Sequence, residues 1–377
     1  MRILKYINLC KNRAELNPYP HHKMNSQENT QDTILKADLC GLYELRPLPA
    51  NLLEIYCCFN KLSCLPPLPK TLRILKCASN RLTRLPELPD SLRILHCGSN
   101  ELSHLPKLPA LIDLEIHVND LKSLRGLPSS LLYLSCGYNE LTELELSANL
   151  EEVNCSTNQI QTLVLPHGLK RLNCHRNKVT TLALPDTLRE LDCSANQIEI
   201  LHLSSGLKQL ICHHNQLESL TLPDSLEELN CAYNKITELK LNERLATVLL
   251  SHNPLVSAPV FPKHLRYVDL RFTNVEACFE ITDRIMITGE LFIQGTPLYT
   301  KVKAVTDEPV TNPEVVKMAF DCIVYIESKI KYIYYLIKAK ARLLAWMWRA
   351  RENIAMKKYH PDELFKRLDD LDALERW

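Results

Sequence analysis

Residues 92–102 read LRILHCGSNEL, and they repeat the pattern of residues 72–82, LRILKCASNRL, twenty positions later. Relative to the asparagine, each copy has leucine eight before, an aliphatic residue five before, cysteine three before and an aliphatic residue two after. The asparagine returns every 19 or 20 residues, at Asn60, Asn80, Asn100, Asn119, Asn139, Asn158, Asn177, Asn196, Asn215, Asn234 and Asn253. A fixed period of this length indicates stacked repeat units.

The pattern L-x-x-L-x-C-x-x-N-x-L is the leucine-rich-repeat signature with cysteine at its third apolar position. A unit of 20 residues cannot bury its own apolar face, so neighbouring units must stack into one core. The alternating L-x-x-L-x-C segment predicts one short parallel strand in each unit. Weaker copies around Leu35, Leu265 and Leu291 extend the array to about 13–14 units. We therefore predict a leucine-rich-repeat solenoid over residues 32–300, with parallel β-strands on its concave face.

The remaining eight or nine residues of each unit are too few for a proper helix. Early units carry paired prolines, as in LSCLPPLPKTL (62–72), which forbid a helix and favour extended backbone. Later units change to L-x-L-P, as in LVLPHGL (163–169), which suggests a second short strand. We predict a convex face of extended segments or short strands.

The extended repeat L-x-x-L-x-C-x-x-N-x-L-x-x-L-P resembles the LPX-type leucine-rich-repeat proteins of secreted bacterial effectors and large DNA viruses. The resemblance covers residues 32 to about 298. Some effectors of this type carry a ubiquitin-ligase domain with a nucleophilic cysteine in a C-x-D setting, whereas Cys322 lies in FDCIVYIE. The resemblance therefore implies the fold without the ligase. For a viral or effector protein it further implies a host protein as partner and the host cytosol as compartment.

Nine cysteines share the inward-facing position three before the asparagine: Cys57, Cys77, Cys97, Cys136, Cys155, Cys174, Cys193, Cys212 and Cys231. Free cysteine packs as a small hydrophobe, and in-register parallel strands hold Cβ atoms farther apart than a disulfide prefers. We predict reduced thiols, hence a reducing, cytoplasmic compartment. No C-x-x-C pair occurs, so we predict neither a zinc site nor another cofactor. The asparagine amides are expected to bond the backbone of the turn that follows each strand.

Outward-facing positions around each strand vary, and in a solenoid they form the default binding surface. Small residues alternate with histidines two before the asparagine, and aromatic residues recur one before it. Aromatic and arginine anchors are typical of protein interfaces, and mixed charges argue against a nucleic-acid groove. The candidate partner-binding residues are Tyr56, Phe59, His96, His117, Tyr138, His175, Arg176, His213, His214, Tyr233, His252, Arg271 and Phe272. Metal binding by His175, His213, His214 and His252 is the alternative.

The two ends of the chain differ from the repeats. We predict a polar segment at residues 1–31, partly helical or disordered, a linker at 301–312, and a helical region at 313–377 with a basic helix followed by an acidic one. The basic helix, with its aromatic residues, caps the open end of the solenoid in one interpretation. In the others it binds an anionic membrane surface through residues 329–358, or it binds a partner or nucleic acid. The tripeptide His360-Pro361-Asp362 resembles the loop of chaperone J-domains, and an ordinary helix start explains it equally.

Catalytic signatures are missing from the sequence, which has no Gly-rich phosphate loop, no G-x-S-x-G and no H-E-x-x-H. The net charge of +1 indicates no bulk electrostatic partner. The sequence also contains neither a secretory signal peptide nor a run of 18 uncharged apolar residues. We predict a non-enzymatic module that binds a protein on the concave face. The competing prediction places function in the basic helix, with the repeats as scaffold.

Overall fold

The computed structural model divides the chain into two units, Met1–Thr33 and Ile34–Trp377. The structure describes residues 33–262, 264–276 and 290–303. The predictions for residues 1–31 and 313–377, including the membrane-binding segment 329–358, lie outside the described residues.

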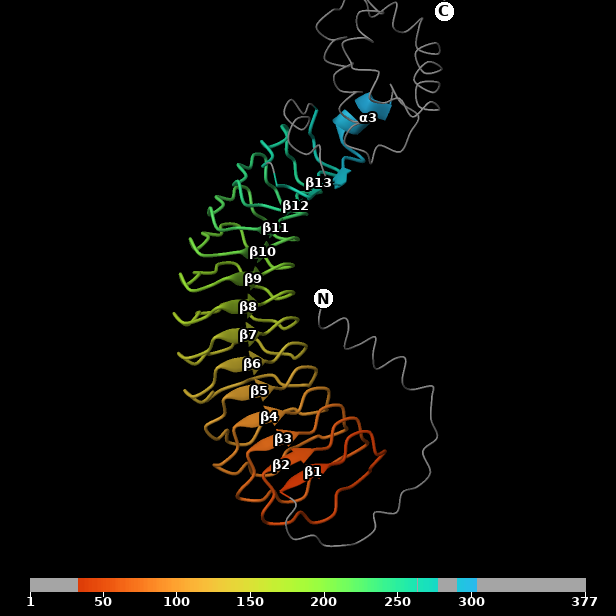
Figure 1. Ribbon diagram of the computed structural model, residues 1–377, viewed down its shortest axis with the longest axis vertical. Coiled ribbons are helices and arrows are strands. Elements are labelled where there is room, and N and C mark those ends of the chain that lie inside the picture. Colours follow the sequence, from red (N-terminus) through yellow and green to blue (C-terminus); the bar gives the residue numbers. More distant parts are fainter. Residues whose placement is uncertain (1–32, 263, 277–289, 304–377) are drawn as a thin grey trace, which may run out of the picture. The chain divides into compact units, whose positions relative to one another are not determined.

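Among the described residues, fourteen three-residue strands form one parallel sheet in sequence order, with consecutive strands hydrogen-bonded to each other (Figure 1). Their bounds are β1 Ile34–Lys36, β2 Glu54–Tyr56, β3 Ile74–Lys76, β4 Ile94–His96, β5 Asp113–Glu115, β6 Tyr133–Ser135, β7 Glu152–Asn154, β8 Arg171–Asn173, β9 Glu190–Asp192, β10 Gln209–Ile211, β11 Glu228–Asn230, β12 Thr247–Leu249, β13 Tyr267–Asp269 and β14 Glu290–Phe292. The predicted parallel-strand solenoid is confirmed.

The strands from β2 to β12 repeat one alternation. The middle residue of a strand is buried and its two neighbours face outward, as for Leu95 of β4 between Ile94 and His96. Strands pair in register, so Leu95 lies between Leu75 and Leu114 in a continuous apolar row. Stacking such rows removes from water the apolar face that a single unit leaves exposed, so the core is one cluster that runs through all the units.

The asparagine column bonds the backbone as predicted. Asn80 Nδ2 donates to the carbonyl of Cys77 in its own unit (3.1 Å) and of Cys57 in the preceding unit (2.9 Å). Its Oδ1 accepts from the backbone N–H of Leu62 (3.1 Å). The same contacts recur unit by unit as far as Asn253. Each asparagine therefore joins two consecutive turns and satisfies groups that have no partner within the sheet.

The cysteine column is also confirmed. All nine members are completely buried and carry free thiols. Ile116 and Leu250 occupy the same row with equal burial, which supports a packing role. Burial raises the pKa of the Cys155 and Cys231 thiols to about 12. A thiol with such a pKa stays protonated at neutral pH and is a poor nucleophile and metal ligand.

The segments that connect the strands contain neither helix nor strand between residues 33 and 262. The prediction of short outer strands from the L-x-L-P steps is therefore wrong. No backbone hydrogen bond joins segment 163–165 to its counterpart 182–184 in the next unit. Pro166 and Pro185, which end these steps, lack the N–H that a second ladder needs.

The repeats end in a short helix, α3 (Pro297–Lys303), which runs three residues into the predicted linker. Thr296 caps it, because its Oγ1 accepts from the N–H of Tyr299 (2.9 Å). Pro297 occupies the first helical position, where the missing N–H has no consequence. Leu298 is buried against the last unit. Within the described residues, no helix is long and apolar enough to cross a membrane.

Candidate binding face

The outward-facing side chains around the sheet form one surface, which we call the strand face. It consists of the first and third residues of each strand together with the residues two and one before each asparagine. We call the residues one before the asparagine, or one before Cys40, Thr273 or Thr296 in the units that lack it, the turn row. Among the described units the turn row is Leu39, Phe59, Ser79, Ser99, Val118, Tyr138, Thr157, Arg176, Ala195, His214, Tyr233, His252, Phe272 and Gly295.

Every residue of the turn row has a positive φ, between 51° and 74°. This left-handed conformation is uncommon outside glycine, and for β-branched residues such as Val118 and Thr157 it is a true outlier. Hydrogen bonds between units impose it, since the N–H of Tyr233 donates to the carbonyl of Ser251 one unit further on (2.8 Å). The backbone ladder thus continues past the three-residue strands, and turn-row side chains emerge at matching positions in successive units.

Four aromatic side chains of the turn row stack on one another. Ring centroids lie 4.1 Å apart for His214 and Tyr233, 4.0 Å for Tyr233 and His252, and 4.5 Å for His252 and Phe272, with interplanar angles of 13°, 13° and 22°. We call these four residues the aromatic stack. Its last ring lies over Gly295, where a Cβ would come within 2.5 Å of the Phe272 ring. The rings remain accessible, with Tyr233 43% and Phe272 55% exposed.

Other predicted residues surround the stack. His213 packs edge-on against His214 at 5.2 Å, and His175 lies 6.3 Å from His213. Burial, together with the neighbouring His214, lowers the pKa of His213. Arg271 donates to Asp269 (2.8 and 2.9 Å) and lies over the ring of Phe292.

The histidines weighed for metal binding are therefore engaged in other contacts. His175 Nδ1 lies 2.8 Å from Ser194 Oγ, and His214 and His252 belong to the aromatic stack. The structure brings seven predicted residues into one region of the strand face: His175, His213, His214, Tyr233, His252, Arg271 and Phe272.

The remaining predicted residues lie apart from that region. Phe59 and Tyr138 are exposed in the turn row, and neither has an aromatic partner among the described residues. Tyr56 donates its hydroxyl to Glu54 (2.8 Å), which raises the pKa of Tyr56. Arg176 is exposed in the turn row. His96 and His117 lie near Glu115, away from the stack.

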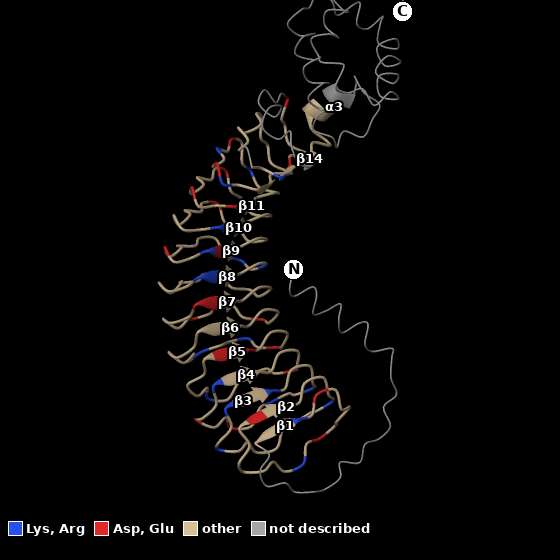
Figure 2. Cartoon of the chain, in the orientation of Figure 1, with Lys and Arg blue, Asp and Glu red and all other residues tan. Residues whose placement is uncertain are grey.

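The strands themselves are rich in acidic side chains. Carboxylates at their first and third positions are Glu54, Asp113, Glu115, Glu152, Glu190, Asp192, Glu228 and Asp269, against the cations Lys36, Lys76 and Arg171. Figure 2 shows acid and base on the neighbouring strands β7 and β8. There Arg171 bonds both Glu152 (2.6 Å) and Glu190 (3.2 Å). The charges at these strand positions are therefore mixed in sign.

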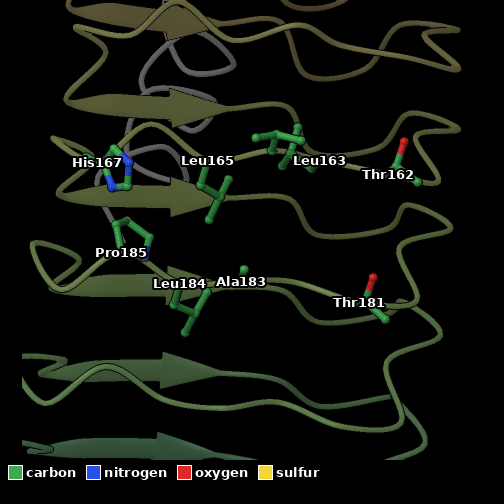
Figure 3. A pocket seen from close by; sticks show the side chains of 9 residues that line it. Thr162, Leu163, Leu165, His167, Thr181, Ala183, Leu184 and Pro185 are labelled. Atoms are coloured by element: carbon green, nitrogen blue, oxygen red, sulfur yellow. The ribbon is translucent and has the colours of Figure 1, made fainter.

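One depression, with a volume of about 360 Å³, lies between two connecting segments (Figure 3). Leu163, Val164 and Leu165 line it from one unit, and Ala183, Leu184 and Pro185 from the next. Its titratable lining residue is His167 at the edge. No Asp, Glu, Lys or Arg lines the depression, so it offers little chemistry for orienting a ligand.

Comparison with solved structures finds leucine-rich-repeat proteins. YopM from Yersinia enterocolitica WA-314 matches with a TM-score of 0.65 at 27% identity, covering 78% of this chain and 73% of that chain. YopM from Yersinia pestis, described as a leucine-rich effector protein, matches with a TM-score of 0.55 at 28% identity, covering 70% and 89%. The chain is thus a leucine-rich-repeat solenoid similar to bacterial effectors. Folds of this class typically serve as non-enzymatic scaffolds for protein interaction.

A functional domain of InlJ from Listeria monocytogenes, described as including a cysteine ladder, shares the fold at 23% identity. Its TM-score is 0.52, and the match covers 65% of this chain and 69% of that one. No family model and no curated protein matches the sequence.

Two features of the strand face were missed from the sequence. The left-handed turn row gives no signal, because its residues include Phe, Val, Thr, Arg and His in place of the glycine or asparagine that marks this conformation. Phe292 was missed because it belongs to the weakest unit, 23 residues after its predecessor. The register of that unit would have placed Phe292 beside Asp269.

Proposed function

We propose that the protein is a non-enzymatic interaction module that binds another protein on the strand face. The observation that carries this proposal is the exposed aromatic stack, His214, Tyr233, His252 and Phe272. Contiguous exposed aromatic surface is uncommon on soluble proteins and marks interaction sites. Tyrosine and other aromatic residues dominate the binding energy of protein interfaces.

The fixed geometry of the stack favours binding. Each ring is held by its neighbours and by a turn whose backbone is bonded to the next unit. Side chains that are already ordered lose little conformational entropy on association, so more of the contact energy appears as affinity.

The charge around the stack indicates the kind of partner. Carboxylates outnumber cations on the strands, and Asp192 and Glu228 lie on strands within or next to the aromatic region. A partner segment with lysine or arginine beside apolar or aromatic residues would complement both features. By the resemblance to effector proteins, the partner is a host protein.

The test uses the full chain as bait in host-cell lysate, followed by binding measurements with the purified partner. The stack variant Tyr233→Ala with Phe272→Ala should weaken the partner's Kd at least tenfold, because each aromatic anchor contributes roughly 2 kcal/mol or more. A matched control variant, Val164→Ala with Ile200→Ala, removes exposed apolar side chains from connecting segments. It should bind normally.

Equal binding by the stack variant and the wild type would contradict the proposal. If the Lys338→Glu, Lys340→Glu and Arg342→Glu variant alone loses capture, function resides in the predicted basic helix.

A further inference from the structure

A second cluster of side chains lies on the strand face at the junction of β4 and β5. His96 of β4 lies opposite Glu115 of β5, and Ile94 lies opposite Asp113. His96 Nε2 is 2.9 Å from Asp113 Oδ2, and His96 Nδ1 is 3.4 Å from Glu115 Oε2. The imidazole thus has a carboxylate at each of its two nitrogens. Its side chain is only 13% exposed, although it points outward.

When the His96 imidazole is neutral, its contact with one of the two carboxylates has no hydrogen bond. A neutral histidine carries one N–H, so only one of the two carboxylates accepts a hydrogen bond from the ring. At the other nitrogen a lone pair faces carboxylate oxygen, which is repulsive. Two neighbouring carboxylates add negative charge to the same place. Either a second proton on the ring or a metal ion bound between that nitrogen and the carboxylate facing it removes the repulsion.

We propose that His96, Asp113 and Glu115 bind a divalent transition-metal ion of the zinc type. Their ligand atoms all lie within 4.8 Å of one another. Metal–ligand bonds of about 2.0–2.2 Å allow two ligand atoms on one ion to be at most about 4.4 Å apart. Asp113 and Glu115 approach different nitrogens of the ring, so one of the three side chains must rotate for all of them to bind the same ion. The site departs from the absence of metal predicted from the sequence, where no spacing motif joins His96 to residues 17 and 19 positions later.

The donor set selects the class of metal. Magnesium and calcium prefer oxygen ligands throughout, whereas imidazole nitrogen suits zinc and its neighbours in the first transition row. Cys97 does not compete, because it lies in the interior column and burial keeps its thiol protonated. Three protein ligands leave at least one coordination position for water or for a side chain of a bound partner.

A fourth side chain is within electrostatic reach of the cluster. Burial lowers the pKa of His117, while Glu115 and His96 act on it in opposite directions. Its ring lies against Gly98, where a Cβ would come within 2.6 Å of the imidazole. Gly98 thus gives His117 the space to lie beside the cluster. His117 is the candidate for an additional ligand or for an outer-shell partner that orients the carboxylates.

The experiment uses the full chain, freed of metal with a chelator and titrated with Zn²⁺ against a chromophoric chelator. Wild type should bind one ion at this cluster. His96→Gln, Asp113→Asn and Glu115→Gln should each weaken Zn²⁺ binding by more than the roughly tenfold expected for loss of an outer-shell partner. Glu152→Gln is the matched control, since Glu152 occupies the strand position of Asp113 but pairs with Arg171. It should bind as wild type does.

Co²⁺ substitution identifies the ligands independently. Nitrogen and oxygen ligation gives visible d–d bands without the near-ultraviolet charge-transfer band of a cobalt thiolate. Circular dichroism and urea midpoints establish that each variant is folded. Uptake that is undetectable in wild type, unchanged in the three ligand variants, or accompanied by a thiolate band would overturn the proposal. The aromatic stack lies on later units, so this outcome leaves the partner-binding proposal intact.

Discussion

In the units from Asn60 to Asn253, the turn-row residue and the asparagine that follows it differ in how much they vary. The asparagine and the cysteine three before it point inward, and both recur almost without change. The turn-row residue points outward and varies from Ser79 to Phe272. Both positions belong to the same hydrogen-bonded turn.

The contrast shows how this solenoid separates stability from recognition. Buried amides and thiols tolerate few replacements, because each must satisfy or pack against the same neighbours in the adjoining units. The turn-row backbone is held by bonds between units, whatever side chain it carries. Side chains for binding can therefore vary on a backbone that stays constant.

High pH should affect the interior most strongly. Burial raises the pKa of the column thiols from 9.0, to about 12 for Cys57, Cys155 and Cys231. The thiol pKa is higher in the folded state than in the unfolded state. The free energy of unfolding is therefore at its full value below the unfolded pKa, and it falls as pH rises from the unfolded pKa to the folded pKa. Between pH 9 and 12 each such thiol should lower the free energy of unfolding by about 1.4 kcal/mol per pH unit. Urea denaturation under reducing conditions, from pH 7 to 10.5, measures this slope.

A variant with Cys155→Ala, Cys174→Ala and Cys193→Ala provides the control for that slope. It should be less stable at pH 7, because each substitution leaves space in the core. Its pH dependence should nevertheless be shallower, since three titrating groups are gone. A wild-type stability that is flat from pH 8 to 10 would show that the thiols do not govern alkaline unfolding.

The substitution Asn215→Ala tests the second interior column. Asn215 donates to the carbonyls of Cys193 and Cys212 and accepts from the N–H of Ile198, each at 3.0 Å. Its loss leaves buried backbone groups unpaired, which should cost about 2–4 kcal/mol of unfolding free energy. In the control Asn173→Ala, the strand face loses a single acceptor for the N–H of His175. Urea midpoints should be clearly lower for Asn215→Ala than for Asn173→Ala. Equal losses of unfolding free energy in the two variants would show that the asparagine column does not contribute special stability.

The same contrast explains what could be predicted from sequence. The inward rows have a strict period, so Leu95, Cys97 and Asn100 specify strand, core and turn from spacing alone. The aromatic stack was predicted only as a recurrence of aromatic residues, because stacking depends on the left-handed turn, which no residue type reveals. The His96 cluster joins residues of different units, and its chemistry depends on register and side-chain orientation.

Replacing valine by glycine should change stability differently in the outward-facing turn row and in the buried core. Val118 is exposed in the turn row at a φ of 56°. Val118→Gly should change stability little or raise it, by about 1 kcal/mol at most, because glycine adopts this conformation without steric cost. Val153→Gly, at the buried centre of β7, should destabilise by several kcal/mol, on the order of 3 or more. Thermal or urea unfolding of both variants measures the contrast, which fails if Val118→Gly destabilises to a similar degree.

The smallest predicted effect concerns His213, which faces outward yet is half-buried. Burial and then His214 lower its pKa below the usual 6.5. The folded protein therefore resists protonation, and its stabilisation, complete above pH 6.5, should be lost as pH falls from 6.5 to the folded pKa. An NMR titration of the His213 ring protons measures that pKa directly. His214→Gln removes the like-charged neighbour and should raise the pKa of His213 part of the way, leaving the contribution from burial. A His213 that titrates at 6.5 in the wild type would mean that its neighbours on the strand face do not exclude water from its ring. Desolvation of this part of the strand face would then have to come from the bound partner.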